Sequence, residues 1–159
     1  LFRMREYVRL GAPDSALAFR DAWMERGLAA LRAVGLAADV ALANDPFFGR
    51  RGRFMAADQR DQSLKFELVV PITSTEKPTA CMSFNYHQDH FGRLFDIHTP
   101  DGEFAHTACV GFGLERIALA LFRTHGMDVL AWPTPVRAAL WPRRRRRHRG
   151  RPAPLPPPA

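Results

Sequence analysis

The chain has 159 residues, 47% of them apolar and 25% charged, which is the composition of an ordinary globular protein with one domain and one core. The formal net charge is +7, but seven arginines lie within residues 143–159, so residues 1–142 are formally neutral. This balance gives no support to a nucleic-acid-binding surface on the globular part.

The sequence also limits the compartment. It has no run of about 18 apolar residues and no leader-like start, so we expect neither a membrane span nor a signal peptide. Its two cysteines, Cys81 and Cys109, lack a CxxC spacing, and we expect reduced thiols in the cytoplasm. Because the chain starts at Leu1 inside a strand-like pattern, we expect a fragment of a longer protein.

The first predicted element is a strand at residues 1–10. Apolar side chains occupy alternate positions there, which predicts a half-buried strand whose apolar face holds Phe2, Met4, Val8 and Leu10. Glu6 falls on the same face. A carboxylate there is costly unless it is paired or bound to a metal. A buried salt bridge to an arginine of a neighbouring strand, or a bend that exposes the side chain, is the simpler interpretation.

The next residues predict a long helix. A turn at 11–14 leads into apolar residues with three- and four-residue spacing over 15–34. Asp14 or Ser15 is the expected N-cap, and Gly35 suits the C-terminal end.

Beyond this helix the pattern alternates between strands and turns. We predict a loop at 44–53, where Phe47 and Phe48 anchor to the core, and a tight turn at Asp101-Gly102. The other predicted elements are strands at 37–43, 64–72, 79–87 and 104–112, a helix at 114–125 and a short helix within 132–141.

Strand hairpins combined with a few helices predict an α+β fold, an antiparallel sheet flanked by helices. We expect residues 1–142 to belong to one folded domain and the Arg- and Pro-rich residues 143–159 to be disordered. A genuine basic tail and a shifted reading frame both remain open for this segment.

Several polar residues lie where chemistry is expected. Lys65 and Glu67 share one strand face, and Ser83 and Asn85 share another, so on adjacent strands they could form the floor of a polar cleft. Two solvated strand faces are the simpler alternative. The histidines at 87, 90, 98 and 106 are interpreted as structural or surface residues.

A thiol, two glycines and an arginine occur close together in "HTACVGFGLERIALALF" at 106–122. The glycines Gly111 and Gly113 lack a Cβ and let a ligand approach the strand end, and Arg116 begins a helix where it could bind phosphate. Simple helix entry with a Glu115–Arg116 surface pair explains the pattern equally well. A lone strand cysteine such as Cys109 or Cys81 is ordinarily a small buried hydrophobe.

Taken together, these stretches resemble class II aminoacyl-tRNA synthetases. "GFGLER" at 111–116 looks like their third signature motif, and "FRMREYVRLG" at 2–11 looks like the second strand of their second motif. More narrowly, five blocks are similar to the amino acid:[carrier protein] ligases, which are truncated relatives of the atypical zinc-dependent seryl-tRNA synthetases. These blocks are "FRMREYVR", "DPFFGR", "LKFELVVPI", "PTACMSFNYHQDHFG" and "HTACVGFGLERIALALF".

The resemblance implies an enzyme that activates a small amino acid (glycine, alanine or serine) with ATP and Mg²⁺. The aminoacyl group then passes to the phosphopantetheine thiol of a carrier protein. It also implies a zinc ion that is held by two cysteines and a glutamate and that binds the substrate amino group. By position, Glu6 and Cys109 are two of these ligands, and Arg116 binds ATP as the catalytic arginine. The other predicted cofactor-binding residues are Glu67, Ser83, Asn85, Gly111 and Gly113.

The same resemblance sets what is expected elsewhere. The first cysteine ligand, the first motif and the leading strand of the second motif are expected upstream of Leu1, so this chain alone is expected to be inactive. The family is usually dimeric. Two alternatives remain: a seryl-tRNA synthetase fragment, which the neutral charge of residues 1–142 disfavours, and a non-catalytic remnant of the fold.

Overall fold

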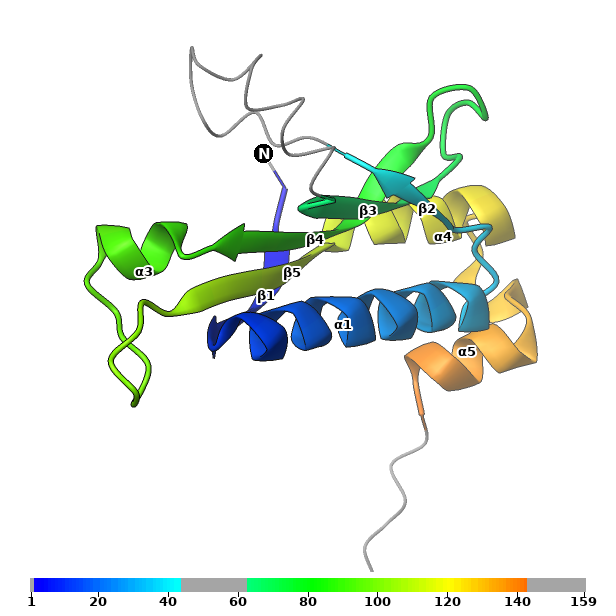
Figure 1. The fold of residues 1–159 in the computed structure, drawn as a ribbon. Coiled ribbons are helices and arrows are strands. Elements are labelled where there is room, and N and C mark those ends of the chain that lie inside the picture. Colours follow the sequence, from blue (N-terminus) through cyan, green and yellow to red (C-terminus); the bar gives the residue numbers. More distant parts are fainter. Residues whose placement is uncertain (1, 44–62, 143–159) are drawn as a thin grey trace, which may run out of the picture.

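The computed structural model describes residues 2–43 and 63–142, so the predicted loop at 44–53, with Phe47 and Phe48, and the tail at 143–159 lie outside the described residues. The described part forms an antiparallel sheet with strand order β1-β5-β4-β3-β2 (Figure 1). The strands are β1 (Met4–Gly11), β2 (Asp39–Leu42), β3 (Lys65–Val70), β4 (Thr79–Gln88) and β5 (His106–Gly113). The predicted antiparallel α+β arrangement is confirmed.

The helices lie beside and beyond this sheet (Figure 1). They are α1 (Pro13–Ala33), α3 (His90–Leu94), α4 (Leu114–His125), a 3₁₀ turn η2 (Val129–Ala131) and α5 (Thr134–Leu140). The prediction of a helix at 114–125 is therefore confirmed. Within the described ranges, no helix combines the length and apolarity needed to cross a membrane.

The ends of α1 differ in how well the sequence predicts them. Gly35 adopts φ +76°, the Gly35 N–H donates to Arg32 O at 2.9 Å, and the Leu36 N–H donates to Leu31 O at 3.0 Å, which is a Schellman ending. The predicted N-cap is wrong, because the helix begins at Pro13 with Ala12 as the cap. Proline suits the first helical position since its φ is fixed and it needs no N–H partner there.

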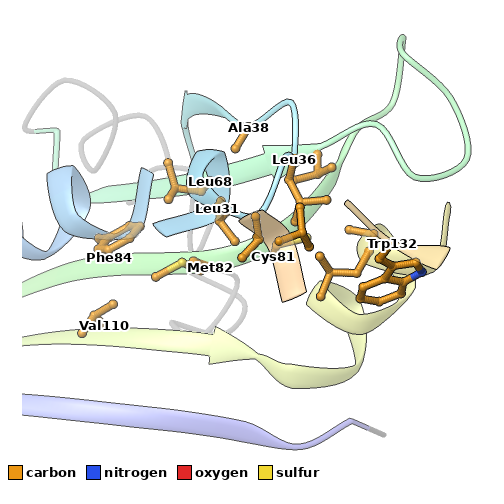
Figure 2. Close-up of a cluster of buried hydrophobic side chains, with 14 residues drawn as sticks. Leu31, Leu36, Ala38, Leu68, Cys81, Met82, Phe84, Val110 and Trp132 are labelled. Carbon is orange, nitrogen blue, oxygen red and sulfur yellow. The ribbon is translucent and has the colours of Figure 1, made fainter. Parts of the chain in front are cut away.

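One face of the sheet carries the core. Helix α1 runs along this face (Figure 1), and its Gly27 allows close contact: an added Cβ would lie 2.7 Å from Met82 Cε. Figure 2 shows the packed side chains, which include Leu31, Leu68, Cys81, Met82, Phe84, Val110 and Trp132. Burial of this many apolar groups is the main stabilising contribution to such a fold.

The predicted burial of the first strand is wrong. Phe2, Met4, Val8 and Leu10 are 39–55% exposed, because their face of β1 lies away from α1 and lines an open cleft. The opposite side of β1 contacts the helix instead: Tyr7 stacks on Trp23 with ring centroids 5.1 Å apart. Alternation therefore predicts the strand correctly but not which face is covered.

A short arm extends the sheet at the end of β4. Its helix α3, which the sequence pattern did not predict, packs through Gly92 against Ala105 just before β5. The tight turn predicted at Asp101-Gly102 is confirmed, since Gly102 has φ +89° and the Gly102 N–H donates to Thr99 O at 2.9 Å. Beside this turn, His98 and Phe104 form a single antiparallel bridge.

Candidate active-site cleft

A cleft of about 820 Å³ opens on the face of the sheet opposite α1. Side chains from β1, β3, β4 and β5 form its floor, α3 lines one part of it, and Arg116 at the start of α4 lines another. A volume of this size is typical of sites for small molecules and cofactors. A cleft is therefore present where the sequence predicted one, but most of its lining is apolar, from side chains such as Met4, Phe91 and Phe95.

Two rows of side chains cross the floor from strand to strand. In the first row Glu6 pairs with Gly111, Gly111 with Ser83, and Ser83 with Glu67. In the second row the paired residues are Val8, Cys109, Asn85 and Lys65. Paired residues of antiparallel strands point to the same face, so both rows face the cleft.

Glu6 lies in this cleft and is exposed to solvent. Exposure was one of its two simpler interpretations, although β1 runs through Glu6 without the expected bend. The other, a buried salt bridge, is absent among the ion pairs between described residues. The carboxylate is tolerated on an apolar strand face because that face is open to water rather than packed. Glu6 and Cys109 are diagonal neighbours on β1 and β5, so the sheet brings the two predicted metal ligands to one area.

Cys109 is only 6% exposed, and its sulfur has polar neighbours on β4. Asn85 Nδ2 donates a hydrogen bond to Cys109 Sγ at 3.3 Å, and His87 Nε2 lies 3.7 Å from the same sulfur. His87 Nδ1 in turn lies 3.0 Å from Thr107 Oγ1. Cys109 is thus buried in a polar setting, unlike a cysteine that only fills an apolar core.

The metal prediction stays a prediction. No group of three or more His, Cys, Asp and Glu side chains in the described ranges is arranged to hold a metal ion. Glu6 and Cys109 supply two donors of the kinds that zinc accepts, a carboxylate oxygen and a sulfur. A protein zinc site needs a third ligand from elsewhere.

Arg116 holds one end of the cleft. Arg116 Nη1 donates to Ala80 O at 3.0 Å, and the guanidinium carbon lies 4.1 Å from the centre of the Phe2 ring. A guanidinium has further N–H donors that can bind a phosphate bidentately. The expected Glu115–Arg116 pair is wrong: Glu115 Oε1 instead accepts a hydrogen bond from Arg3 Nε at 2.9 Å.

The two glycines of β5 make room for protein groups in this structure. A Cβ on Gly111 would lie 2.5 Å from Met4 Cε, the flexible tip of a side chain that can swing aside for a ligand. A Cβ on Gly113 would lie 3.2 Å from Cys81 O and 3.3 Å from Phe2 Cε2. Gly113 therefore lets Phe2 and Arg116 lie close to the strand. This close approach sets how far the Arg116 guanidinium lies from the sheet.

Two charged residues of the predicted cleft floor form an ion pair. Lys65 Nζ and Glu67 Oε1 lie 3.6 Å apart on β3, with side chains only 13% and 26% exposed.

Cys81 sits below the cleft with 1% exposure, and burial raises the pKa of its thiol to about 11, while the nearby Arg116 lowers it in part. The prediction of Cys81 as a buried hydrophobe is confirmed.

Sequence reasoning missed some residues of the cleft. His87 was interpreted as structural or surface, but it contacts the Cys109 sulfur. Strand alternation does predict that His87 shares a face with Ser83 and Asn85, but it does not indicate the contact with the sulfur. Phe91 and Phe95 of the α3 arm also line the cleft, and no strand or helix pattern indicated them.

Comparison with known proteins supports this architecture. No protein-family model matches the chain. Amino acid–[acyl-carrier-protein] ligases 1 and 2 of Bradyrhizobium diazoefficiens are each 55% identical over 139 residues, 87% of this chain, and the chain spans only 43% and 42% of their own lengths. The type-2 serine–tRNA ligase of Methanopyrus kandleri is 28% identical over 145 residues, 85% of this chain and 27% of that relative.

Solved structures agree on the fold. The crystal structure of M. kandleri seryl-tRNA synthetase with A. aeolicus tRNASec matches 87% of this chain and 28% of that chain, with a TM-score of 0.72 and 26% identity. Seryl-tRNA synthetase from Pyrococcus horikoshii, complexed with ATP, matches 78% of this chain and 27% of that chain, with a TM-score of 0.59 and 12% identity, which shows the fold alone. The chain thus carries part of a class II seryl-tRNA synthetase catalytic fold, in a sequence similar to amino acid–[acyl-carrier-protein] ligases.

Proposed function

We propose that the protein to which this chain belongs activates a small amino acid with ATP and transfers it to a carrier protein. The observation that carries the proposal is the 55% identity to two amino acid–[acyl-carrier-protein] ligases over 139 residues. The cleft supports it, because the two rows of side chains that run across its floor place acidic, basic, amide and thiol groups around one space.

The first step joins the amino acid to AMP. A carboxylate oxygen of the amino acid attacks the α-phosphorus of ATP, a new P–O bond forms, and pyrophosphate leaves. Arg116 binds phosphate oxygens in this proposal, and Mg²⁺ offsets the remaining negative charge. Glu67, Ser83, Asn85, Gly111 and Gly113 line the cleft and are proposed to contact the nucleotide or the amino acid.

The second step releases AMP. The phosphopantetheine sulfur of the carrier protein attacks the carbonyl carbon of the adenylate, a thioester forms, and AMP leaves with the bonding electrons. Residues of the cleft would orient the two reactants and exclude water, which otherwise hydrolyses the mixed anhydride. Glycine, alanine and serine are the proposed substrates, because the family resemblance implies a small amino acid.

We also propose a zinc site that includes Glu6 and Cys109. Their diagonal placement on one sheet face and the polar neighbours of the Cys109 sulfur fit a metal ligand better than a core cysteine. Zinc bound there would ligate the neutral amino group of the substrate and so discriminate against acids that lack one. The third ligand is proposed to lie outside this chain, and a homodimer is the proposed assembly.

A second candidate is charging of tRNA. The 28% identity to a type-2 serine–tRNA ligase favours it, whereas the formal neutrality of residues 1–142 favours a protein acceptor. A non-catalytic role is the third possibility. These functions differ in the molecule that receives the amino acid, so one acceptor assay separates them.

The test uses the whole protein with ATP, Mg²⁺ and labelled glycine, alanine or serine, and offers both a phosphopantetheinylated carrier protein and tRNA. We expect label on the carrier protein. Label on tRNA alone would show that the protein is an aminoacyl-tRNA synthetase instead. Label on neither, without amino-acid-dependent pyrophosphate exchange, would leave a fold without this chemistry.

The zinc site has its own test. We predict that Glu6→Ala or Cys109→Ser lowers the zinc content of the whole protein, because each removes one of few ligands. Cys81→Ser is the matched control, since Cys81 is the other buried thiol and carries no predicted ligand role. Full zinc occupancy in both ligand variants, measured by elemental analysis of folded protein, would exclude the site.

A further inference from the structure

The sulfur of Cys109 meets two nitrogen atoms from one neighbouring strand. Asn85 Nδ2 donates to it at 3.3 Å, and His87 Nε2 lies at 3.7 Å. Asn85 and His87 are two residues apart on β4, so alternation points both side chains to the face that holds Cys109. Each of these nitrogen atoms can carry an N–H that points at the sulfur.

Thr107 fixes the orientation of the histidine ring. Its side chain is 2% exposed, lies on the cleft side of β5 two residues before Cys109, and places Oγ1 3.0 Å from His87 Nδ1. When the Thr107 hydroxyl donates to Nδ1, the ring proton resides on Nε2 and points at the sulfur. In the other tautomer the thiol donates to Nε2 and Thr107 accepts. In both arrangements the contact with Thr107 Oγ1 fixes the ring so that Nε2 lies beside the sulfur.

Asn85 is held opposite Cys109 by the register of β4 and β5. Its Oδ1 atom is buried without a hydrogen-bond partner among the described residues. A buried amide that leaves one polar atom unsatisfied costs stability, so an asparagine at this position needs a reason other than folding. The hydrogen bond from Nδ2 to the sulfur supplies one.

We propose that Asn85 and His87, the latter aligned by Thr107, are positioning residues that hold the Cys109 sulfur by hydrogen bonds on the face of the sheet that it shares with Glu6. This inference rests on the zinc site of the proposed function. N–H groups that donate to a ligating sulfur fix its direction and draw charge from it, which sets both metal affinity and the electronic character of the metal–sulfur bond.

The experiment compares variants of the whole protein. Asn85→Ala and Thr107→Val remove the amide donor and the hydroxyl that orients His87. Thr107→Ser keeps the hydroxyl, and Thr99→Val makes the same threonine change in the exposed turn of the α3 arm. The readouts are zinc affinity by competition with a chromophoric chelator and the position of the thiolate-to-metal charge-transfer band after Co²⁺ replaces zinc.

We expect Asn85→Ala and Thr107→Val to lower zinc affinity by about tenfold or more, the usual effect of losing such a partner, and to shift the cobalt band. Thr107→Ser and Thr99→Val should retain wild-type values. A role limited to folding would change thermal stability but leave the band of the folded fraction in place, and that result would overturn the inference.

The outcomes also separate the two proposals. Zinc binding that is lost in Cys109→Ser but unchanged in Asn85→Ala and Thr107→Val would refute the positioning role and leave the metal site standing. A wild-type protein that binds no zinc would refute both. If Thr107→Val does not fold, Asn85→Ala decides the question, because it only shortens a side chain on the open face.

Discussion

Arg116 combines an anchored guanidinium with access to the cleft, since it binds Ala80 O and stacks on Phe2. In the whole protein we predict that Arg116→Ala raises the ATP concentration needed for half-maximal activation about tenfold or more, because a hydrogen bond to a charged group contributes about 1.5–3 kcal/mol. Amino-acid-dependent pyrophosphate exchange measured across ATP concentrations gives this value. Zinc content should be unchanged.

Arg123→Ala provides the control on the same helix. Arg123 Nε donates to Ile72 O at 3.2 Å on an exposed surface, so the variant removes an equal charge away from the cleft. We expect it to keep the wild-type ATP requirement. An equal ATP requirement in wild type and Arg116→Ala would remove Arg116 from the phosphate-binding role.

Cys81 predicts a loss of stability at alkaline pH. Burial raises the pKa of its thiol from 9.0 to about 11, so the folded state keeps a proton that the unfolded state releases. The resulting stabilisation is fully present below pH 9 and is lost as pH rises towards 11. Between pH 9 and pH 11, the free energy of unfolding of wild type should fall by on the order of 2–3 kcal/mol more than that of Cys81→Ala, as measured by denaturant unfolding. Parallel stability curves for the two proteins would contradict this prediction.

At the level of single residues, the sequence predicted the floor of the cleft better than its contacts. Period-two alternation on strands is enough to place Ser83 with Asn85 and Lys65 with Glu67 on one face. It could not show that Glu115 binds Arg3 or that Arg116 binds Ala80 O, because these contacts join segments far apart in the chain.

The α3 arm depends on one close backbone approach. A Cβ on Gly92 would lie 2.2 Å from Ala105 O, a backbone atom that cannot move away by a side-chain rotation. We predict that Gly92→Ala lowers the free energy of unfolding by about 1–3 kcal/mol through overpacking. Thermal or denaturant unfolding of the purified protein measures this change.

Gly27→Ala is the matched glycine substitution. Its nearest neighbour would be Met82 Cε at 2.7 Å, a flexible side-chain end, and alanine gains up to about 1 kcal/mol over glycine within a helix. This variant should therefore cost less than Gly92→Ala. A larger loss of unfolding free energy in Gly27→Ala than in Gly92→Ala would contradict the prediction that the backbone contact at Gly92 is the less tolerant of a Cβ.

Elements were predictable where their signal is local. Helix α4 begins and ends as predicted, since its apolar periodicity and Gly126 are both in the sequence. The five residues of α3 are too few for a periodic pattern. The covered face of β1 depends on which neighbour packs against it, and that is a property of the whole sheet rather than of the strand.

For the whole molecule, the chain accounts for less than half the length of the two ligases that it resembles. Residues 143–159 carry seven of the arginines, and the similarity to these ligases spans 139 residues, 87% of the chain. We predict that deleting 143–159 from the protein changes neither its unfolding midpoint nor its amino acid activation. A large loss in either measurement would show that the segment belongs to the working domain.

The sheet separates two kinds of constraint by position. On β4 and β5, residues that face α1 alternate with residues that face the cleft. Neighbours in the sequence are therefore constrained differently, one by packing of the core and the next by the contents of the cleft. Evolution can then exchange one set while the other is kept. Substrate and acceptor can diverge between descendants of one ancestor without any of them losing the shared architecture. This is how relatives that serve tRNA and relatives that serve carrier proteins can be built on one sheet.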